Sequence, residues 1–186
     1  GELKIPGYSD YLHPYDETHI LGFGKDTDET GAGRVTTAGL KVALFDVTDP
    51  TSPVEVSAVH FGGKYSESNL LYDHKALLFD REKHLLVMPA TLYPDDNDSY
   101  GQPEFYGFLV LNVDLEGGIT ERGRVAAYQA DTEYYYYGSY NQRSLYVGDV
   151  LYSWDGLALT ASDLESLGEL GQTVLVDNTD YPYYIY

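Results

Sequence analysis

The stretch that decides the fold is Leu71 to Thr91, LYDHKALLFDREKHLLVMPAT. It holds an apolar run from Lys75 to Asp80, a polar turn at Arg81-Glu82-Lys83, and a second apolar run from His84 to Ala90. Two short apolar runs joined by a polar turn are typical of a β-hairpin. We therefore predict two antiparallel strands in this stretch.

The same hairpin pattern occurs twice more in the chain. An earlier copy is Asp10 to Gly24, DYLHPYDETHILGFG, and it aligns when Asp16 is set on Asp80. A looser later copy is Arg143 to Trp154, RSLYVGDVLYSW, with Asp149 at the turn. A unit that recurs at intervals of about 65 residues predicts a repeat architecture.

Each hairpin is followed by a connection, an apolar strand, a turn and a fourth strand. We expect the third strands at 40–47, 105–113 and 157–162, and the fourth strands at 54–61, 119–127 and 169–176. Four-stranded antiparallel units in series predict an all-β chain, a β-propeller with about three blades. The predicted blades are 8–62, 71–127 and 143–177. A β-sandwich would explain the strands but not their repeated order.

Propellers usually have roughly 4–8 blades, so three blades indicate part of a larger ring. We interpret residues 1–186 as a propeller fragment, or as one of two copies that complete a ring together. Residues 2–6 are expected to form a strand of a preceding blade, and the aromatic tail 178–186 to cover an edge. A homodimer and the remaining blades of a longer protein are the two partners that this interpretation offers.

Composition supports the all-β interpretation and excludes several classes of partner. The 20 Tyr and 19 Gly favour strands and turns. The formal net charge is −19, from 30 acidic and 11 basic residues, so nucleic acid is excluded as a partner. No apolar run reaches the ~18 residues of a membrane span, so membrane insertion is not expected. With no cysteine, disulfides are excluded.

The polar connections of an antiparallel blade alternate between its two ends. The long connections 25–38, 62–73, 92–104 and 128–142 should therefore share one end of the propeller, whereas the other end receives only tight turns. Long loops on a rigid frame are where binding residues concentrate. We expect any functional site at the end that carries the long connections.

Two of these connections are acidic. The candidate metal ligands are Asp26, Asp28 and Glu29 in the first, and Asp95, Asn97 and Asp98 in the second. Calcium prefers several carboxylate and carbonyl oxygens on a turn-rich segment, so Ca²⁺ is the cofactor that such loops would hold. The alternative is a solvated acidic surface with no bound ion.

The hairpin alignment also yields a candidate ring of polar residues. Six positions before each turn aspartate stand Asp10, His74 and Arg143, which should begin the innermost strands around the mouth of the central channel. An acid, a titratable base and a fixed cation could together bind a polar ligand there. Alternatively, these residues cap strands and bond to neighbouring backbone.

A tyrosine-rich segment lies between the second and third blades. Its residues Tyr134, Tyr135, Tyr136, Tyr137 and Tyr140 would give rigid, amphipathic contact area for a carbohydrate or a protein. If alternate rings are buried between blades, the segment contributes only packing.

Four segments carry a resemblance to a known family: PGYSDYLHPYDETHILGFGKDT, GLKVALFDVTDPTSPVEV, YSESNLLYDHKALLF and RSLYVGDVLYS. They resemble secreted archaeal and bacterial proteins whose C-terminal β-propeller is distantly related to WD repeats. The resemblance implies an extracellular or cell-surface location and further blades N-terminal to this chain, but no reaction. The tyrosine-rich segment departs from the family pattern.

Catalytic motifs are absent from the sequence, which has no G-x-S-x-G elbow, phosphate-binding glycine loop or H-E-x-x-H pair. We therefore expect a non-enzymatic extracellular binding or scaffolding module that contacts a cell-surface protein or glycan. The alternative is a hydrolase or lyase that acts on polysaccharide, with its site at the channel mouth. A third interpretation is a purely structural spacer.

Overall fold

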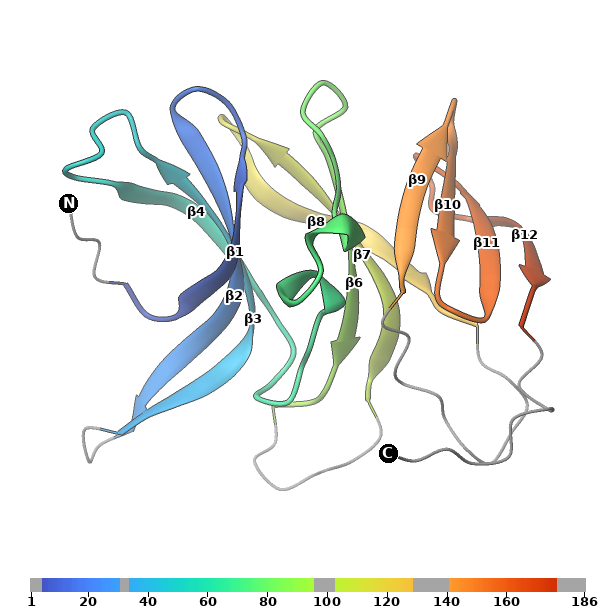
Figure 1. Ribbon diagram of the computed structural model, residues 1–186, viewed down its shortest axis with the longest axis horizontal. Helices are drawn as coiled ribbons and strands as arrows, with labels where there is room; N and C mark the ends of the chain where they lie inside the picture. The colour runs from blue at the N-terminus through green and yellow to red at the C-terminus, as the bar shows by residue number, and fades with distance from the viewer. Residues whose placement is uncertain (1–4, 31–33, 96–102, 129–140, 177–186) are drawn as a thin grey trace.

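The computed structural model describes residues 5–30, 34–95, 103–128 and 141–176 of the chain (Figure 1). These residues form three four-stranded antiparallel sheets, each built from strands that follow one another in sequence. The sheets stand side by side in a row (Figure 1). The predicted all-β architecture of four-stranded blades is confirmed, and we call the sheets blades 1, 2 and 3 in chain order.

Blade 1 contains the longest strands. It consists of β1 (Tyr8–Pro14), β2 (His19–Thr30), β3 (Arg34–Asp46) and β4 (Val54–Phe61). The prediction of a loop over residues 25–38 is wrong, because β2 and β3 remain paired through Thr27↔Thr37 and on to Thr30↔Arg34. The threonines and Val35 in this stretch favour strand conformation more than the interspersed acids and glycines oppose it.

Blade 2 comprises β5 (Leu78–Asp80), β6 (Leu85–Leu92), β7 (Phe105–Asp114) and β8 (Gly118–Ala126). Two 3₁₀ turns precede it, η1 (Asn69–Leu71) and η2 (His74–Ala76). The predicted strand from Lys75 is therefore too long. The Asp73 side chain accepts a hydrogen bond from the Lys75 backbone N–H, and this cap starts η2 where the strand was expected.

Blade 3 is formed by β9 (Arg143–Val147), β10 (Val150–Trp154), β11 (Ala158–Asp163) and β12 (Glu169–Val174). Each predicted blade span contains one of the three sheets. For the expected strand at 2–6, Ile5 is not in a strand and residues 1–4 lie outside the described residues. The tail 178–186 also lies outside them.

Blade 2 is buried on both faces. Successive side chains of a strand point to opposite faces, so β6 and β7 contribute to two different cores. One face of β6 and β7 joins blade 1 in a shared core that includes Leu21, Phe23, Val42, Leu44, Leu86, Met88, Leu109 and Leu111. The opposite face meets blade 3 in a second core that includes Leu85, Val87, Phe108, Val110, Leu151 and Leu164. Face-to-face packing of apolar sheet surfaces therefore holds the three blades together.

Aspartates close most of the tight turns. The Asp16 side chain accepts hydrogen bonds from the backbone N–H groups of Thr18 and His19, both at 2.8 Å. Further aspartates accept a backbone N–H in the same way at Asp49, Asp80, Asp114 and Asp163. Aspartate favours turns because it bonds to backbone a few residues further on. The aspartates that aligned the hairpins, Asp16 and Asp80, thus belong to the turn structure.

In the described part of the chain, neither helical turn is long and apolar enough to cross a membrane.

Candidate functional site

The two ends of the blades differ in their connections (Figure 1). One end, which we call the long-connection end, carries the extended β2–β3 hairpin, residues 62–77 with η1 and η2, and the connections 93–104 and 127–142. The other, the tight-turn end, carries only short connections, at 15–18, 47–53, 81–84, 115–117, 148–149 and 164–168. Candidate ligand residues are therefore concentrated at the long-connection end.

The three aligned residues occupy different local settings. Arg143 is the first residue of β9 and Asp10 is the third residue of β1. His74 does not begin an innermost strand as expected, but starts η2 four residues before β5. Among the described residues, no hydrogen bond, ion pair or ring contact joins any two of the three directly.

Two of these residues, His74 and Arg143, instead take part in contacts that link blades 1 and 3 to the segment 62–77 before blade 2. The ring of Tyr11 in β1 stacks on the ring of His74, with centroids 5.9 Å apart. Arg143 Nη2 lies 2.5 Å from Asp73 Oδ2, and Arg143 Nη1 donates to the Gln142 backbone carbonyl at 2.7 Å. The aligned positions therefore lie at or beside contacts that β1 and β9 make with the segment 62–77 before blade 2. The bond from Arg143 to Gln142 agrees with the alternative of bonding to neighbouring backbone.

A second polar group at this end was missed by the sequence interpretation. Lys25, only 5% exposed, lies in β2, where its Nζ donates to the Ser66 carbonyl and contacts Glu67 Oε1 at 2.7 Å. The Tyr72 hydroxyl donates to the other Glu67 oxygen at 3.5 Å. A buried ammonium is costly unless it is paired, so Glu67 and Ser66 stabilise Lys25 in place.

Carboxylates and exposed tyrosines surround this pair. Tyr72 is 79% exposed and Tyr8, in β1, is 49% exposed. Partial loss of contact with water raises the pKa of Asp10. The positive charge of Lys25 opposes this rise, and the negative charge of Glu67 adds to it. The negative charge of Glu67, followed by desolvation and by Asp10, raises the pKa of Tyr72. Aromatic rings beside carboxylates can stack on and hydrogen-bond a polar ligand.

The candidate metal ligands form no cluster in the described residues, where no group of three or more His, Asp or Glu could hold an ion. Asp26 Oδ1 accepts a hydrogen bond from the Thr27 backbone, and its Oδ2 lies 3.3 Å from His60 Nε2. The backbones of Asp28 and Glu29 belong to β2. Asp95 is exposed, whereas Asn97 and Asp98 lie outside the described residues.

The tyrosine-rich segment cannot be placed in the site. Tyr134, Tyr135, Tyr136, Tyr137 and Tyr140 all lie within 129–140, outside the described residues. Among the tyrosines that the structure describes at this end, Tyr8 and Tyr72 are the exposed ones that lie beside Asp10 and Glu67.

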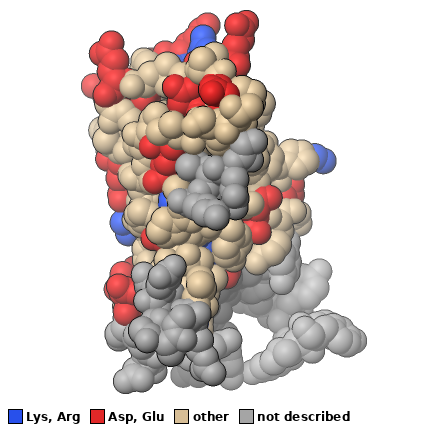
Figure 2. Space-filling model, turned by 90° about the vertical axis from the view of Figure 1, so that its left-hand side faces the viewer, with Lys and Arg blue, Asp and Glu red and all other residues tan. Residues whose placement is uncertain are grey.

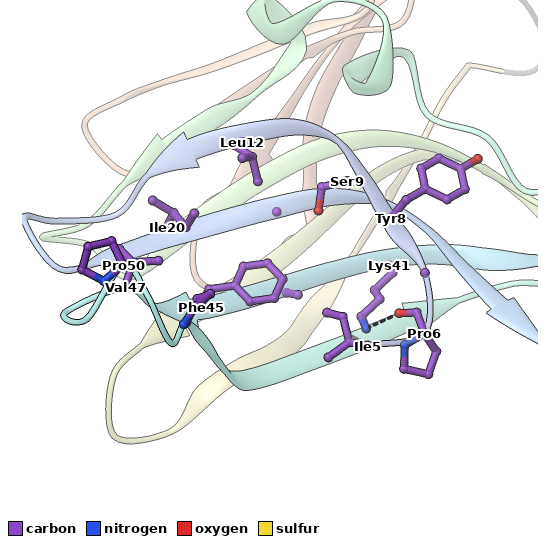
Figure 3. A pocket seen from close by; sticks show the side chains of 14 residues that line it. Ile5, Pro6, Tyr8, Ser9, Leu12, Ile20, Lys41, Phe45, Val47 and Pro50 are labelled. Atoms are coloured by element: carbon purple, nitrogen blue, oxygen red, sulfur yellow. Dashed lines mark hydrogen bonds between the residues drawn. The ribbon is translucent and has the colours of Figure 1, made fainter. Parts of the chain in front are cut away.

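The free face of blade 1 was also missed by the sequence interpretation. An apolar hollow of about 390 Å³ lies there, lined by residues that include Leu12, Ile20, Ala43, Phe45 and Pro53 (Figure 3). Lys41 Nζ donates to the Pro6 carbonyl at 3.1 Å across this face. A signal was present in the sequence, because adjacent apolar residues such as Ile20-Leu21 indicate burial on both faces of the sheet.

Among the charged side chains visible on this side of the molecule, the acidic ones outnumber Lys and Arg (Figure 2). The hollow itself is lined by one charged residue, Lys41. Contiguous apolar areas of this kind are surfaces on which other apolar surfaces commonly pack.

Three four-stranded antiparallel blades with shared cores define the chain as a β-propeller type of protein. A family model, described as a β-propeller domain, matches residues 1–167, and the chain belongs to this family.

The chain is similar to an uncharacterized protein of Archaeoglobus fulgidus, 38% identical over 90 residues, and to one of Methanocaldococcus jannaschii, 37% identical over 90 residues. Each match covers 48% of this chain and 13% of the relative, so the chain spans only a small part of these relatives. No solved structure matches the chain.

Proposed function

We propose that the chain is a non-enzymatic binding or scaffolding module that acts outside the cell or at its surface, and that its long-connection end binds a cell-surface glycan or protein. The observation that carries the proposal is the group of exposed Tyr8 and Tyr72 beside Asp10 and Glu67 at that end. Tyrosine rings offer stacking area at low entropic cost, and carboxylates accept hydrogen bonds from hydroxyl and amine groups. The resemblance to secreted proteins supports the location.

Screening the purified chain against arrays of surface glycans and surface proteins tests this proposal. We expect saturable binding that is weakened when Tyr72 is replaced by Ala. Replacement of Leu115, which is exposed at the tight-turn end, should leave binding unchanged. Absence of binding in both screens would contradict the proposal.

A scaffolding role is supported by the free face of blade 1. Blade 2 buries both of its faces, whereas the equivalent face of blade 1 exposes Leu12, which is 53% exposed, beside the apolar hollow. We propose that another blade packs on this face, supplied by the rest of a longer protein or by a second copy. That contact would extend the three blades toward a larger ring.

The chain has no native cysteine, so single cysteines can report on this face. We expect the Leu12→Cys variant to react rapidly with a thiol reagent in a solution of isolated chains and slowly once the face is covered. Leu145 is exposed on β9 of blade 3, so a disulfide between Leu12→Cys and Leu145→Cys chains would identify a second copy as the source. Equally fast reaction in this chain and in a protein with further N-terminal sequence, without cross-linking, would contradict packing on this face.

Calcium is proposed as the ion of the long-connection end, where Asp95 precedes Asn97 and Asp98 in one connection. Calorimetric titration with Ca²⁺ should give saturable binding that Asp98→Asn weakens. If the titration releases or absorbs no heat beyond the heat of dilution, the proposal that Ca²⁺ binds at this end is contradicted.

A second candidate function is a hydrolase or lyase that acts on polysaccharide. The observation that favours it is the raised pKa of Asp10, which keeps a carboxyl closer to the protonated form that a general acid needs. Asp10, His74 and Arg143 would then act at the channel mouth. Release of reducing or unsaturated sugar ends, abolished by Asp10→Asn and by His74→Ala, would support this function over binding alone.

A further inference from the structure

A hollow of about 480 Å³ lies between blades 2 and 3 at the tight-turn end. It is lined by Lys83, Arg122, Asp149, Asp163, Leu164 and Glu165. Five of these six residues are charged, in contrast to the apolar lining of the hollow on blade 1. The hollow is at the opposite end of the blades from the proposed binding surface, so it is a separate feature.

Both cations of the hollow belong to blade 2, and among the described residues neither lies within 4.0 Å of a carboxylate oxygen. Arg122 Nε donates to Asn112 Oδ1 at 2.8 Å, and Arg122 Nη1 donates to the Leu164 carbonyl at 3.4 Å. Lys83 Nζ lies 5.1 Å from the centre of the Tyr146 ring. Neutral groups thus orient Arg122. Lys83 instead lies over the Tyr146 ring and close to Asp80, whose pKa is lowered by the hydrogen bond from Tyr146 and also by the charge of Lys83. Neither cation forms an ion pair within the described residues, in a chain where acids outnumber bases 30 to 11.

The opposite wall belongs to blade 3 and is acidic. Asp163 uses Oδ1 to close its own turn, accepting from the Ser166 backbone and hydroxyl, both at 2.7 Å. Its Oδ2 takes part in neither bond. Asp149 and Glu165 are exposed and, within the described residues, form no ion pair. The hollow is therefore polarised, with cations on the blade 2 side and carboxylates on the blade 3 side.

We propose that this hollow binds a small zwitterion, whose carboxylate contacts Arg122 and Lys83 and whose ammonium contacts the carboxylates of blade 3. A simple anion would be repelled by three carboxylates, and a simple cation by Lys83 and Arg122. A ligand with both charges meets an opposite charge on each wall, and the guanidinium of Arg122 is suited to a carboxylate. The proposal does not depend on the function proposed for the long-connection end.

Calorimetric titrations with glycine, β-alanine and γ-aminobutyrate test the proposal, because these zwitterions place the two charges at increasing separation. Acetate and methylammonium are the controls, since each supplies one charge alone. At low ionic strength, where surface charges are least screened, at least one zwitterion should bind ten times or more tightly than either control. Failure of all three zwitterions to bind, or equal binding of acetate or methylammonium, would overturn the proposal.

Variants locate the site. Arg122→Gln and Asp149→Asn should each weaken binding tenfold or more. Lys83→Gln on the blade 2 wall and Glu165→Gln on the blade 3 wall change exposed residues and repeat the test. The matched controls are Arg124→Gln, which lies in the same strand but pairs with Glu121 at 2.7 Å, and Glu116→Gln in a neighbouring turn. Binding that survives the changes on either wall would overturn the assignment, as would equal loss in the controls.

Discussion

Arg143 of β9 donates a hydrogen bond to Asp73 at 2.5 Å, and this ion pair joins the third blade to the η2 turn that leads into the second. The stacked rings of Tyr11 and His74 join the first blade to the same turn. Two of the residues that the hairpin repeat singled out, His74 and Arg143, therefore contribute to the contacts between blades. Both contacts can be measured as contributions to stability.

The pair of Asp73 and Arg143 should contribute little to the free energy of unfolding. Both side chains are about one-third exposed, and ion pairs with such access to water contribute about 0.2–1 kcal/mol. A double-mutant cycle with Asp73→Asn and Arg143→Gln, followed by urea unfolding, should give a coupling energy of about 0.5 kcal/mol. The coupling should shrink in 1 M salt. No coupling at low salt would mean that the pair does not join the blades in solution.

The turn aspartates should make stability depend on pH. The backbone N–H of Gly117 lowers the pKa of Asp114, and the backbone N–H and hydroxyl of Ser166 lower the pKa of Asp163. A carboxyl whose pKa is lowered by folding stabilises the fold above its unfolded pKa, about 3.9, and loses this contribution as pH falls through its folded pKa. Thermal unfolding of wild type and Asp163→Asn should therefore differ at pH 7 and converge near pH 2. A difference of constant size would contradict this role.

Asp10 should behave in the opposite way. Desolvation, with a contribution from Glu67, raises its pKa, so ionisation of Asp10 disfavours the folded state. The Asp10→Asn variant should have a higher melting temperature than wild type at pH 7. This advantage should disappear as pH falls below the ordinary aspartate pKa of about 3.9, where Asp10 is protonated in both states. A lower melting temperature for Asp10→Asn at pH 7 would show that the charge stabilises the fold.

A cavity in the core between blades 1 and 2 should strongly lower the free energy of unfolding. Phe23 is fully buried there, and Phe23→Ala should lower the free energy of unfolding by about 3–5 kcal/mol. Leu12→Ala, on the free face of blade 1, is the matched control and should cost below about 0.5 kcal/mol in the isolated chain. Chemical denaturation of both variants measures the difference. Similar costs for the two would mean that the free face is buried in solution.

The blade pattern could be predicted from the sequence because its signals are local. Asp16 and Asp80 each bond to backbone within three residues, so the turn and its flanking strands recur as a recognisable motif. The extension of β2 and β3 was missed because the three acids and two glycines of 25–38 favour a loop, whereas its four threonines favour a strand. The pairing of Thr27 with Thr37 prevails over that composition.

The polar contacts of the site could not be predicted in the same way. Lys25 and Glu67 are 42 residues apart, and they meet only because the connection between blades 1 and 2 passes beside the middle of β2. Asp73 and Arg143 are 70 residues apart, the first in the connection before blade 2 and the second in blade 3. No periodicity or spacing in the sequence encodes such contacts, since they depend on how the sheets stack.

Binding measured by surface plasmon resonance on the ligand selected from the glycan and protein arrays tests the proposed function most directly. Wild type, Tyr72→Ala, Tyr8→Ala and the tight-turn control Leu115→Ala would be compared as folded proteins of equal secondary structure. We predict that each tyrosine variant binds at least ten times more weakly than wild type, whereas Leu115→Ala binds normally. Unchanged affinity in both tyrosine variants, or equal loss in Leu115→Ala, would contradict binding through the long-connection end.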